Sequence, residues 1–222
     1  MKEETIFSNF IFLKLRAEFR LLTSNAQLAM KQEFEDFTAN AQEKVFLRTY
    51  AMSGMRADSD MLVWMMSADI NRLQKISAKI FNSGIGKYFA CSYILTGVYK
   101  GGVKEEDKLN SSGKFGKYRY MLLHPTVKTD SWYGLSEDKK NELWNRRSEM
   151  LDKIGGINEN FFYSYGLAEH EMIAEREAET PELLASATFA LRSCEMKKYT
   201  EKDKPVFFCI GRDLTEILDQ LA

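Results

Sequence analysis

The sequence predicts an α+β fold in which two ferredoxin-like units, each with the order β-α-β-β-α-β, follow one another in a single chain. Three observations support this: strand-like and helix-like segments alternate in that order, helix caps and core positions recur at one fixed spacing, and a Gly- and Lys-rich segment separates the two copies. The helices of each unit cover only one face of its sheet. We therefore expect the two remaining apolar faces to pack on each other as a dimeric-type α+β barrel.

The first copy, residues 1–100, begins with a predicted strand at 5–16 that is rich in Ile, Phe and Leu. Ser24 and Gln27 have the spacing of a capping box, and apolar residues recur behind them at helical spacing. The nearly continuous apolar run at residues 60–66 predicts a strand buried on both faces. The remaining predicted elements are strands at 45–53, 60–66 and 88–99 and a helix from Ile70 to Ile80.

Residues 101–117 contain few apolar side chains, which predicts a linker or surface loop. The pattern then restarts in the second copy, residues 118–222. Its fifth element has a strong helix start, because Thr180 can cap the helix and Pro181 suits its first turn. The predicted elements are strands at 118–127, 161–165, 170–178 and 205–210, and helices at 136–153, from Thr180 to Leu191 and at 213–221.

The two copies match in register as well as in order. Asp60 and Glu171 are 111 residues apart, and so are the predicted caps Asp69 and Thr180. The same spacing relates the core pairs Leu73 and Leu184, Ile76 and Ala187, and Ile80 and Leu191, whereas Gly54 and Gly166 are 112 apart. A duplicated unit accounts for caps and core positions agreeing together.

Composition narrows the function classes. The net charge is −1, from 31 basic and 32 acidic residues, which does not favour nucleic acid or an acidic membrane as a partner. The charged N-terminus does not resemble a signal peptide, and no apolar run is long enough to span a membrane. Three cysteines without a CxxC pair are typical of reduced thiols, so we expect a cytoplasmic protein. Dinucleotide-binding, zinc-site and serine-hydrolase motifs are absent from the sequence, and we predict no metal ligands.

Two stretches resemble a known family. The first is GMRADSDMLVW at 54–64, and the second is HPTVKTDSWY at 124–133, followed by Ser164-Tyr165-Gly166-Leu167. Together they are similar to the chlorite dismutase-like family, which includes the coproheme decarboxylases of haem synthesis. The resemblance covers roughly residues 45–212, and it implies the barrel fold and assembly into rings, often pentamers.

The resemblance also implies a haem or coproheme site in the second copy. The family has an axial histidine on the helix after the Trp-Tyr element, a distal Arg or Gln on the next strand, and, in the decarboxylases, a Tyr before the Pro. Here the axial position falls on Arg146 or Arg147, the distal position on Glu159, and the tyrosine position on His124. An arginine stays protonated and does not ligate iron, so the axial ligand is not identified.

Each candidate residue has an alternative interpretation. His124 is either an axial ligand or general base, or a strand histidine with a satisfied hydrogen bond. Lys128, Arg146 and Arg147 either bind carboxylates such as porphyrin propionates, or belong to a solvated face with ion pairs such as that of Arg146 with Glu142.

Trp132 and Tyr133 either line a pocket or belong to the core. His170, between two glutamates, is expected at the surface.

Two functional hypotheses remain open. The first is a haem- or coproheme-binding oxidoreductase with altered axial chemistry, in which His124 and Glu159 are catalytic. Its cofactor would contact Lys128, Trp132, Tyr133, Arg146 and Arg147. The second is a non-catalytic oligomeric scaffold or small-molecule binding protein that has lost haem ligation.

Overall fold

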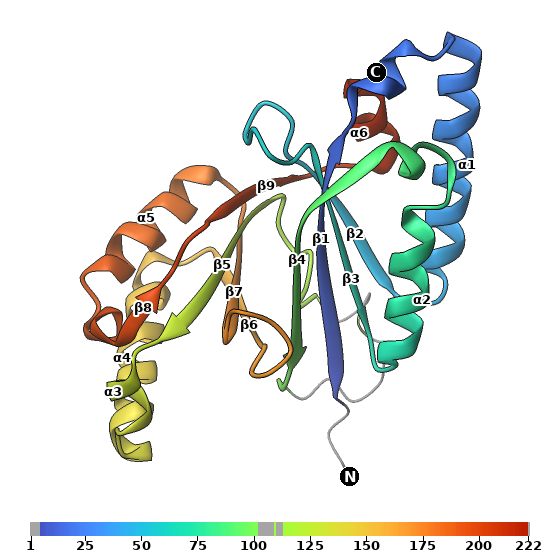
Figure 1. Cartoon of the computed structure of the whole chain (residues 1–222). Coiled ribbons are helices and arrows are strands. Elements are labelled where there is room, and N and C mark those ends of the chain that lie inside the picture. The colour runs from blue at the N-terminus through green and yellow to red at the C-terminus, as the bar shows by residue number, and fades with distance from the viewer. Residues whose placement is uncertain (1–4, 102–108, 110–112, 222) are drawn as a thin grey trace.

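The chain forms an antiparallel sheet that closes on itself, as seen in a computed structural model that describes residues 5–101, 109 and 113–221 (Figure 1). The strand order is β7-β6-β4-β1-β3-β2-β9-β5-β8, and β5 also pairs with β7. This last pairing closes the barrel, and β8 lies outside the ring beside the end of β5.

The elements of the first copy lie where the sequence predicts them. Its strands are β1 (Ile6–Leu15), β2 (Phe46–Ala51), β3 (Met61–Ser67) and β4 (Phe89–Tyr99), and its helices are α1 (Ser24–Gln42) and α2 (Ile70–Ile80). Two 3-10 turns that the sequence did not predict, η1 (Ala17–Leu21) and η2 (Gly84–Tyr88), follow β1 and α2.

The second copy repeats this order with additions. Its strands are β5 (Tyr120–Lys128), β6 (Ile157–Tyr163), β7 (Met172–Ala178) and β9 (Phe207–Gly211), and its helices are α4 (Glu137–Ile154), α5 (Pro181–Arg192) and α6 (Leu214–Gln220). The short elements α3 (Asp130–Tyr133), η4 (Glu195–Tyr199) and β8 (Thr200–Lys202) were not predicted.

One predicted cap is wrong by a residue. Thr23, rather than Ser24, caps α1 and accepts a hydrogen bond from the backbone N–H of Ala26. Ser24 is already helical. The amide of Gln27 instead donates to the carbonyls of Phe19 and Leu22, and so ties the start of α1 to the preceding turn.

The duplicated ferredoxin-like fold is confirmed by the strand order. Each copy has the same internal arrangement, β4-β1-β3-β2 in the first and β9-β5-β7-β6 in the second, and the copies join through β2–β9 and β4–β6. The 111-residue register also holds in atomic contacts. Asp60 accepts from the backbone N–H of Leu15, and Glu171 accepts in the same way from Lys128.

The barrel interior contains aromatic side chains from both copies. Trp64 stacks on Phe10 at 5.1 Å between ring centroids and meets the edge of Phe162 at 6.0 Å. Leu109 and Phe115, from the segment expected to be a linker, are buried in the same cluster. Residues 102–108 and 110–112 of that segment lie outside the described part of the chain.

Two carboxylates also lie in this interior. The sequence places Glu175 and Glu177 on the same face of the predicted strand as Ile173, and all of β7 is buried. The two side chains share the inward face with Ile173, and Asn160 and Asn158 on β6 donate to them. One oxygen of each carboxylate has no hydrogen-bond partner, and burial raises the pKa of both groups.

Helices cover the outer face of the barrel on two sides (Figure 1). α1, α2 and the C-terminal α6 lie over the first copy, where Ile217 and Leu218 join a hydrophobic cluster with Phe34 and Leu73. α4 and α5 lie over the second copy. No helix in the described ranges is long and apolar enough to cross a bilayer.

Candidate functional site

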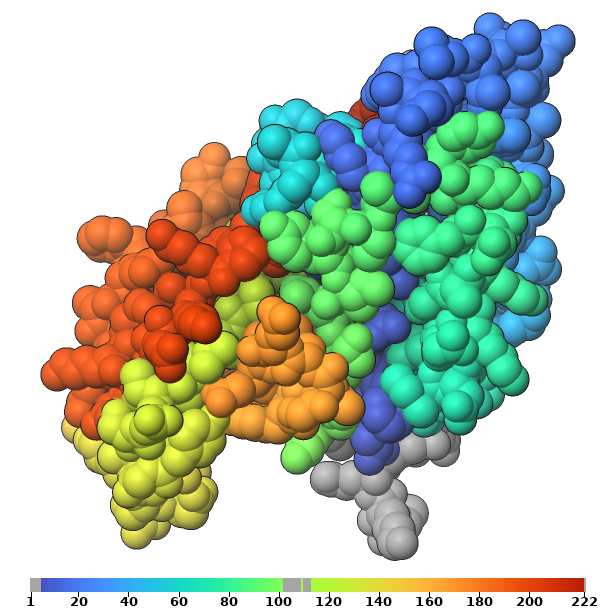
Figure 2. All heavy atoms as spheres, viewed as in Figure 1, coloured from blue at the N-terminus to red at the C-terminus, as the bar shows by residue number. Residues whose placement is uncertain are grey.

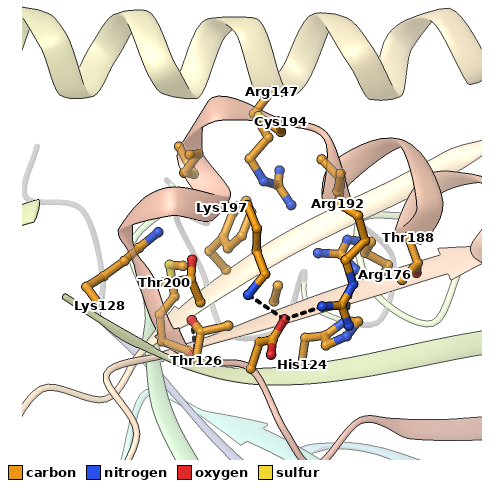
Figure 3. Close-up of a pocket in the computed structure, with 16 residues that line it drawn as sticks. His124, Thr126, Lys128, Arg147, Arg176, Thr188, Arg192, Cys194, Lys197 and Thr200 are labelled. Carbon is orange, nitrogen blue, oxygen red and sulfur yellow. Dashed lines mark hydrogen bonds and ion pairs between the residues drawn. The ribbon is translucent and has the colours of Figure 1, made fainter.

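A cavity of about 90 Å³ lies between the outer sheet face of the second copy and the elements α4, α5 and η4 (Figure 3). Phe161, Met172 and Leu191 contribute apolar surface to it. Its most distinctive feature is a set of basic side chains drawn from five elements. These are Lys128 (β5), Arg147 (α4), Arg176 (β7), Arg192 (α5) and Lys197 (η4).

Strand alternation aims these groups at the cavity. On β5, Met121 and Leu123 point into the barrel, so His124 points outward beneath the helices. On β7, Ala174 lies opposite His124, and Arg176 lies opposite Glu159 of β6. The central strand therefore holds Arg176 between His124 and Glu159.

A buried ion network forms one wall of the cavity. Glu159 accepts from both terminal nitrogens of Arg147 and from Nε of Arg176. All three side chains are less than 10% exposed. Burial alone would raise the pKa of Glu159, but Arg176 and Arg147 outweigh it, so the net effect is a lowered pKa. Glu159 is thus held as a carboxylate.

His124 completes this network, with its Nδ1 2.9 Å from Nη1 of Arg176. A guanidinium can only donate, so Nδ1 must accept and the ring proton lies on Nε2. Burial, and then the charge of Arg176, lower the pKa of His124 to about 4. The imidazole is therefore neutral and has no free lone pair to offer.

At another part of the cavity, Lys197 and Arg192 converge on one carboxylate, as the dashed lines in Figure 3 mark. The ammonium of Lys197 lies 3.0 Å from Oδ2 of Asp203, and Nη1 of Arg192 lies 3.4 Å from it. These side chains are more exposed than the buried network, which places them nearer to solvent.

Within the described part of the chain, Lys128 has aromatic neighbours and no ion-pair partner. Its ammonium lies 4.5 Å from the ring centroid of Trp132 and 5.9 Å from that of Trp144. Both distances allow cation–π attraction. Lys128 itself is buried.

The structure thus brings together five of the residues singled out from the sequence: His124, Lys128, Trp132, Arg147 and Glu159. It places Tyr133 and Arg146 elsewhere. Tyr133 is half-exposed, and Arg146 pairs with Glu142 and Glu195 outside the cavity, as the surface interpretation of that residue expected.

Sequence reasoning missed Trp144, Arg176, Arg192, Lys197 and Asp203. Only Arg176 had a usable signal, because a charged residue within a strand that must be buried needs a partner. The surface prediction for His170 is wrong: the residue is 9% exposed, and its Nε2 is buried without a hydrogen-bond partner among the described residues.

The residues present do not fit an iron porphyrin. Arg147 is bound to Glu159, Arg146 faces away, and the nitrogens of His124 are committed as described. Cys194 and Met196 line the cavity but pack in the apolar cluster around Leu143. No group of three or more potential metal-binding side chains exists among the described residues. A cavity of about 90 Å³ is also far smaller than the ~300–1,000 Å³ of ordinary cofactor pockets.

Comparison with known proteins places the chain by sequence and by fold. The sequence model described as chlorite dismutase matches residues 27–212. A coproheme decarboxylase from Mycolicibacterium smegmatis is 19% identical over 170 residues, which cover 71% of this chain and 69% of that protein.

Among solved structures, a mutant chlorite dismutase from Candidatus Nitrospira defluvii superimposes with a TM-score of 0.88 at 16% identity, covering 99% of this chain and 96% of that one. The imidazole complex of the same enzyme gives 0.86 at 15% identity, with the same coverage. The family match extends over most of both copies, and the fold agrees along nearly the whole chain. The chain therefore belongs to the chlorite dismutase family.

Proposed function

We propose that this protein binds a small carboxylate-bearing molecule in the cationic cavity of its second copy and does not bind haem iron. The observation that supports this is an imbalance of charge. Five cations line the cavity, whereas among the described residues only Glu159 and Asp203 pair with them, and His124 is neutral. A net charge of +3 in a largely buried site favours an anionic ligand, because buried charges need partners.

The shape of the cavity limits the ligand's size. About 90 Å³ suits a molecule of a few heavy atoms, and the apolar wall of Phe161, Met172 and Leu191 suits a short carbon chain. A carboxylate matches the remaining requirement, since Arg and Lys bind it through charge-assisted hydrogen bonds. The ligand would thus be a short-chain organic acid.

A second candidate is a haem- or coproheme-binding oxidoreductase with altered axial chemistry. It is supported by the family and by the coproheme decarboxylase among the relatives. It requires Arg147 to leave Glu159 and a new iron ligand to enter, and it requires the cavity to expand several-fold. The observed ion network opposes each of these changes.

The test compares the two ligands directly. Lactate, followed by calorimetry, should bind saturably at one site per chain and more weakly at high salt. Lys197→Gln should weaken this binding. Haemin and iron coproporphyrin should leave the free-porphyrin Soret band unchanged. A saturable Soret shift at one equivalent per chain would contradict the proposal, and its loss in His124→Ala would then identify the ligand.

We also propose that the chain assembles with copies of itself, as a pentamer, in the cytoplasm. The exposed apolar side chains of Ile94 and Leu167 line one groove. The 165–170 loop (orange) adjoins the β4 segment (green) in Figure 2. Such a patch suits a subunit contact, and the exposed thiol of Cys91 suits a reducing compartment. Light scattering should give five times the 25.7 kDa chain mass, and a monomer would contradict this.

A further inference from the structure

Lys128 is a buried lysine without a counter-ion. It is only 6% exposed, and in the described part of the chain no carboxylate comes within ion-pair distance of its ammonium. The carboxylate of Glu171 accepts a hydrogen bond from the backbone N–H of Lys128 at 2.7 Å, and not from its ammonium. A structural lysine would be expected to reach a carboxylate or water. This one ends against Trp132 and Trp144 while lining the cavity.

The surroundings of Lys128 favour its neutral amine. Burial is the main cause, and the positive charges of Arg147 on α4 and Lys197 on η4 act in the same direction. Glu171 and Cys194 act in the opposite direction, each less than Arg147 but more than Lys197. The net effect lowers the pKa of Lys128 to about 8. At pH 8, about half of this side chain is therefore free amine, against roughly 0.4% of a lysine with a pKa of about 10.4.

A free amine in a partly buried pocket is a nucleophile toward carbonyl carbon. The same cavity has cations positioned to hold a carboxylate, namely Arg192 and Lys197, which share one acid. A 2-oxo carboxylate is the smallest molecule that has both groups, with the carbonyl next to the carboxylate. The apolar wall leaves room only for a short chain beyond it.

We propose that Lys128 forms a reversible imine with a short-chain 2-oxo carboxylate bound in this cavity. This rests on the carboxylate-binding function proposed above. The amine nitrogen attacks the keto carbon to give a carbinolamine. The C–O bond then breaks, the C=N bond forms, and the keto oxygen leaves as water with the two amine hydrogens. Nothing is oxidised or reduced, so no co-reactant is required.

Borohydride trapping tests the proposal, because it reduces an imine to a stable secondary amine. The purified full chain is incubated with pyruvate, reduced, and analysed by intact mass and peptide mapping. We expect one adduct per chain, located on Lys128 and about tenfold or more above that on any exposed lysine. Its initial rate of formation should rise with pH around a midpoint near 8.

Three controls make the outcome decisive. Lys128→Arg keeps the charge but cannot form an imine, so it should lose the adduct. Lys153→Arg, at an exposed position near the end of α4, should keep it. Lactate has the carboxylate without the carbonyl, so it should bind and give no adduct. Binding of both acids without trapping at Lys128, or adducts spread evenly over the lysines, would overturn the imine and leave the binding function intact. Failure of both acids to bind would overturn both proposals.

Discussion

Replacing Glu159 by Gln should destabilise the fold strongly, because it removes the only acid of a buried network. Glu159 accepts three charge-assisted hydrogen bonds, and Arg147 and Arg176 have no other carboxylate partner among the described residues. Removing one partner of a buried ion pair costs about 3–5 kcal/mol, since it leaves the other charge unpaired. For a chain of 222 residues, that lowers the melting temperature by roughly 6–11 °C.

The assay is urea denaturation at pH 7 alongside a thermal melt, with Glu142→Gln as the matched control. Glu142 pairs with Arg146 on the exposed face of α4, the helix that carries Arg147, so its replacement should leave the midpoint unchanged. Because Arg176 and Arg147 lower the pKa of Glu159, the difference between wild type and Glu159→Gln should persist on mild acidification. It should vanish only as pH falls through that lowered value. Equal midpoints for Glu159→Gln and wild type at pH 7 would refute the reasoning.

Three further outcomes follow from the charges of the second copy. The folded-state pKa of His124, about 4, lies below the ~6.5 of an unfolded chain, so between these values the unfolded state binds more protons. The free energy of unfolding should fall by about 3 kcal/mol from pH 6.5 to 4. The urea midpoint of His124→Gln should not show this fall, and the same dependence of midpoint on pH in both proteins would exclude the contribution of His124. Glu175, whose pKa is raised by burial and by Glu177, destabilises the fold increasingly as pH rises above 4.5. Glu175→Gln should therefore melt higher than wild type at pH 8, with the gain shrinking toward pH 4.5, and a lower melt at pH 8 would count against a buried, unpaired carboxylate. Asp203→Asn should tighten lactate binding about 3- to 10-fold by calorimetry, because it frees Lys197 and Arg192, whereas weaker binding would show that Asp203 organises the site.

The fold could be predicted from the sequence because its signals are local and repeated. Apolar periodicity, the caps Asp69 and Thr180 and the 111-residue register each constrain a short segment, and the duplication doubles the evidence. The short elements α3, η4 and β8 gave no such signal, because a single turn or a three-residue strand has no period to detect. Yet η4 supplies Lys197 to the cavity.

The site was only half predictable for a related reason. His124, Lys128, Arg147 and Glu159 were found because the family motifs fix their positions relative to Pro125 and Gly166. Arg192 and Lys197 lie outside any motif, and they reach the cavity only because α5 and η4 fold back over the sheet. The ion-pair partners could not be predicted from the sequence either, since the contact between Arg176 and Glu159 depends on the register of β6 against β7.

The first copy shows that this barrel does not need buried charges on its outer sheet face. In the first copy Val63 lies opposite Ile11, just as Ala174 lies opposite His124 in the second. Likewise, Leu47 lies opposite Met65 in the first copy, just as Glu159 lies opposite Arg176 in the second. Each polar position of the second copy therefore has an apolar counterpart in the first, all packed in one core cluster. The counterparts of His124, Lys128, Glu159 and Arg176 are Ile11, Leu15, Leu47 and Met65.

The same strand pairing thus forms with either the charged or the apolar side chains at these positions. Exchanging a buried ion network for apolar side chains of similar size is often neutral or stabilising, so folding stability alone gives no reason for the charged set. A reason must come from outside the fold, and the cavity lies beside those charged residues. The first copy, with apolar residues at these positions, is the internal comparison on which the proposal of a ligand for the second copy rests.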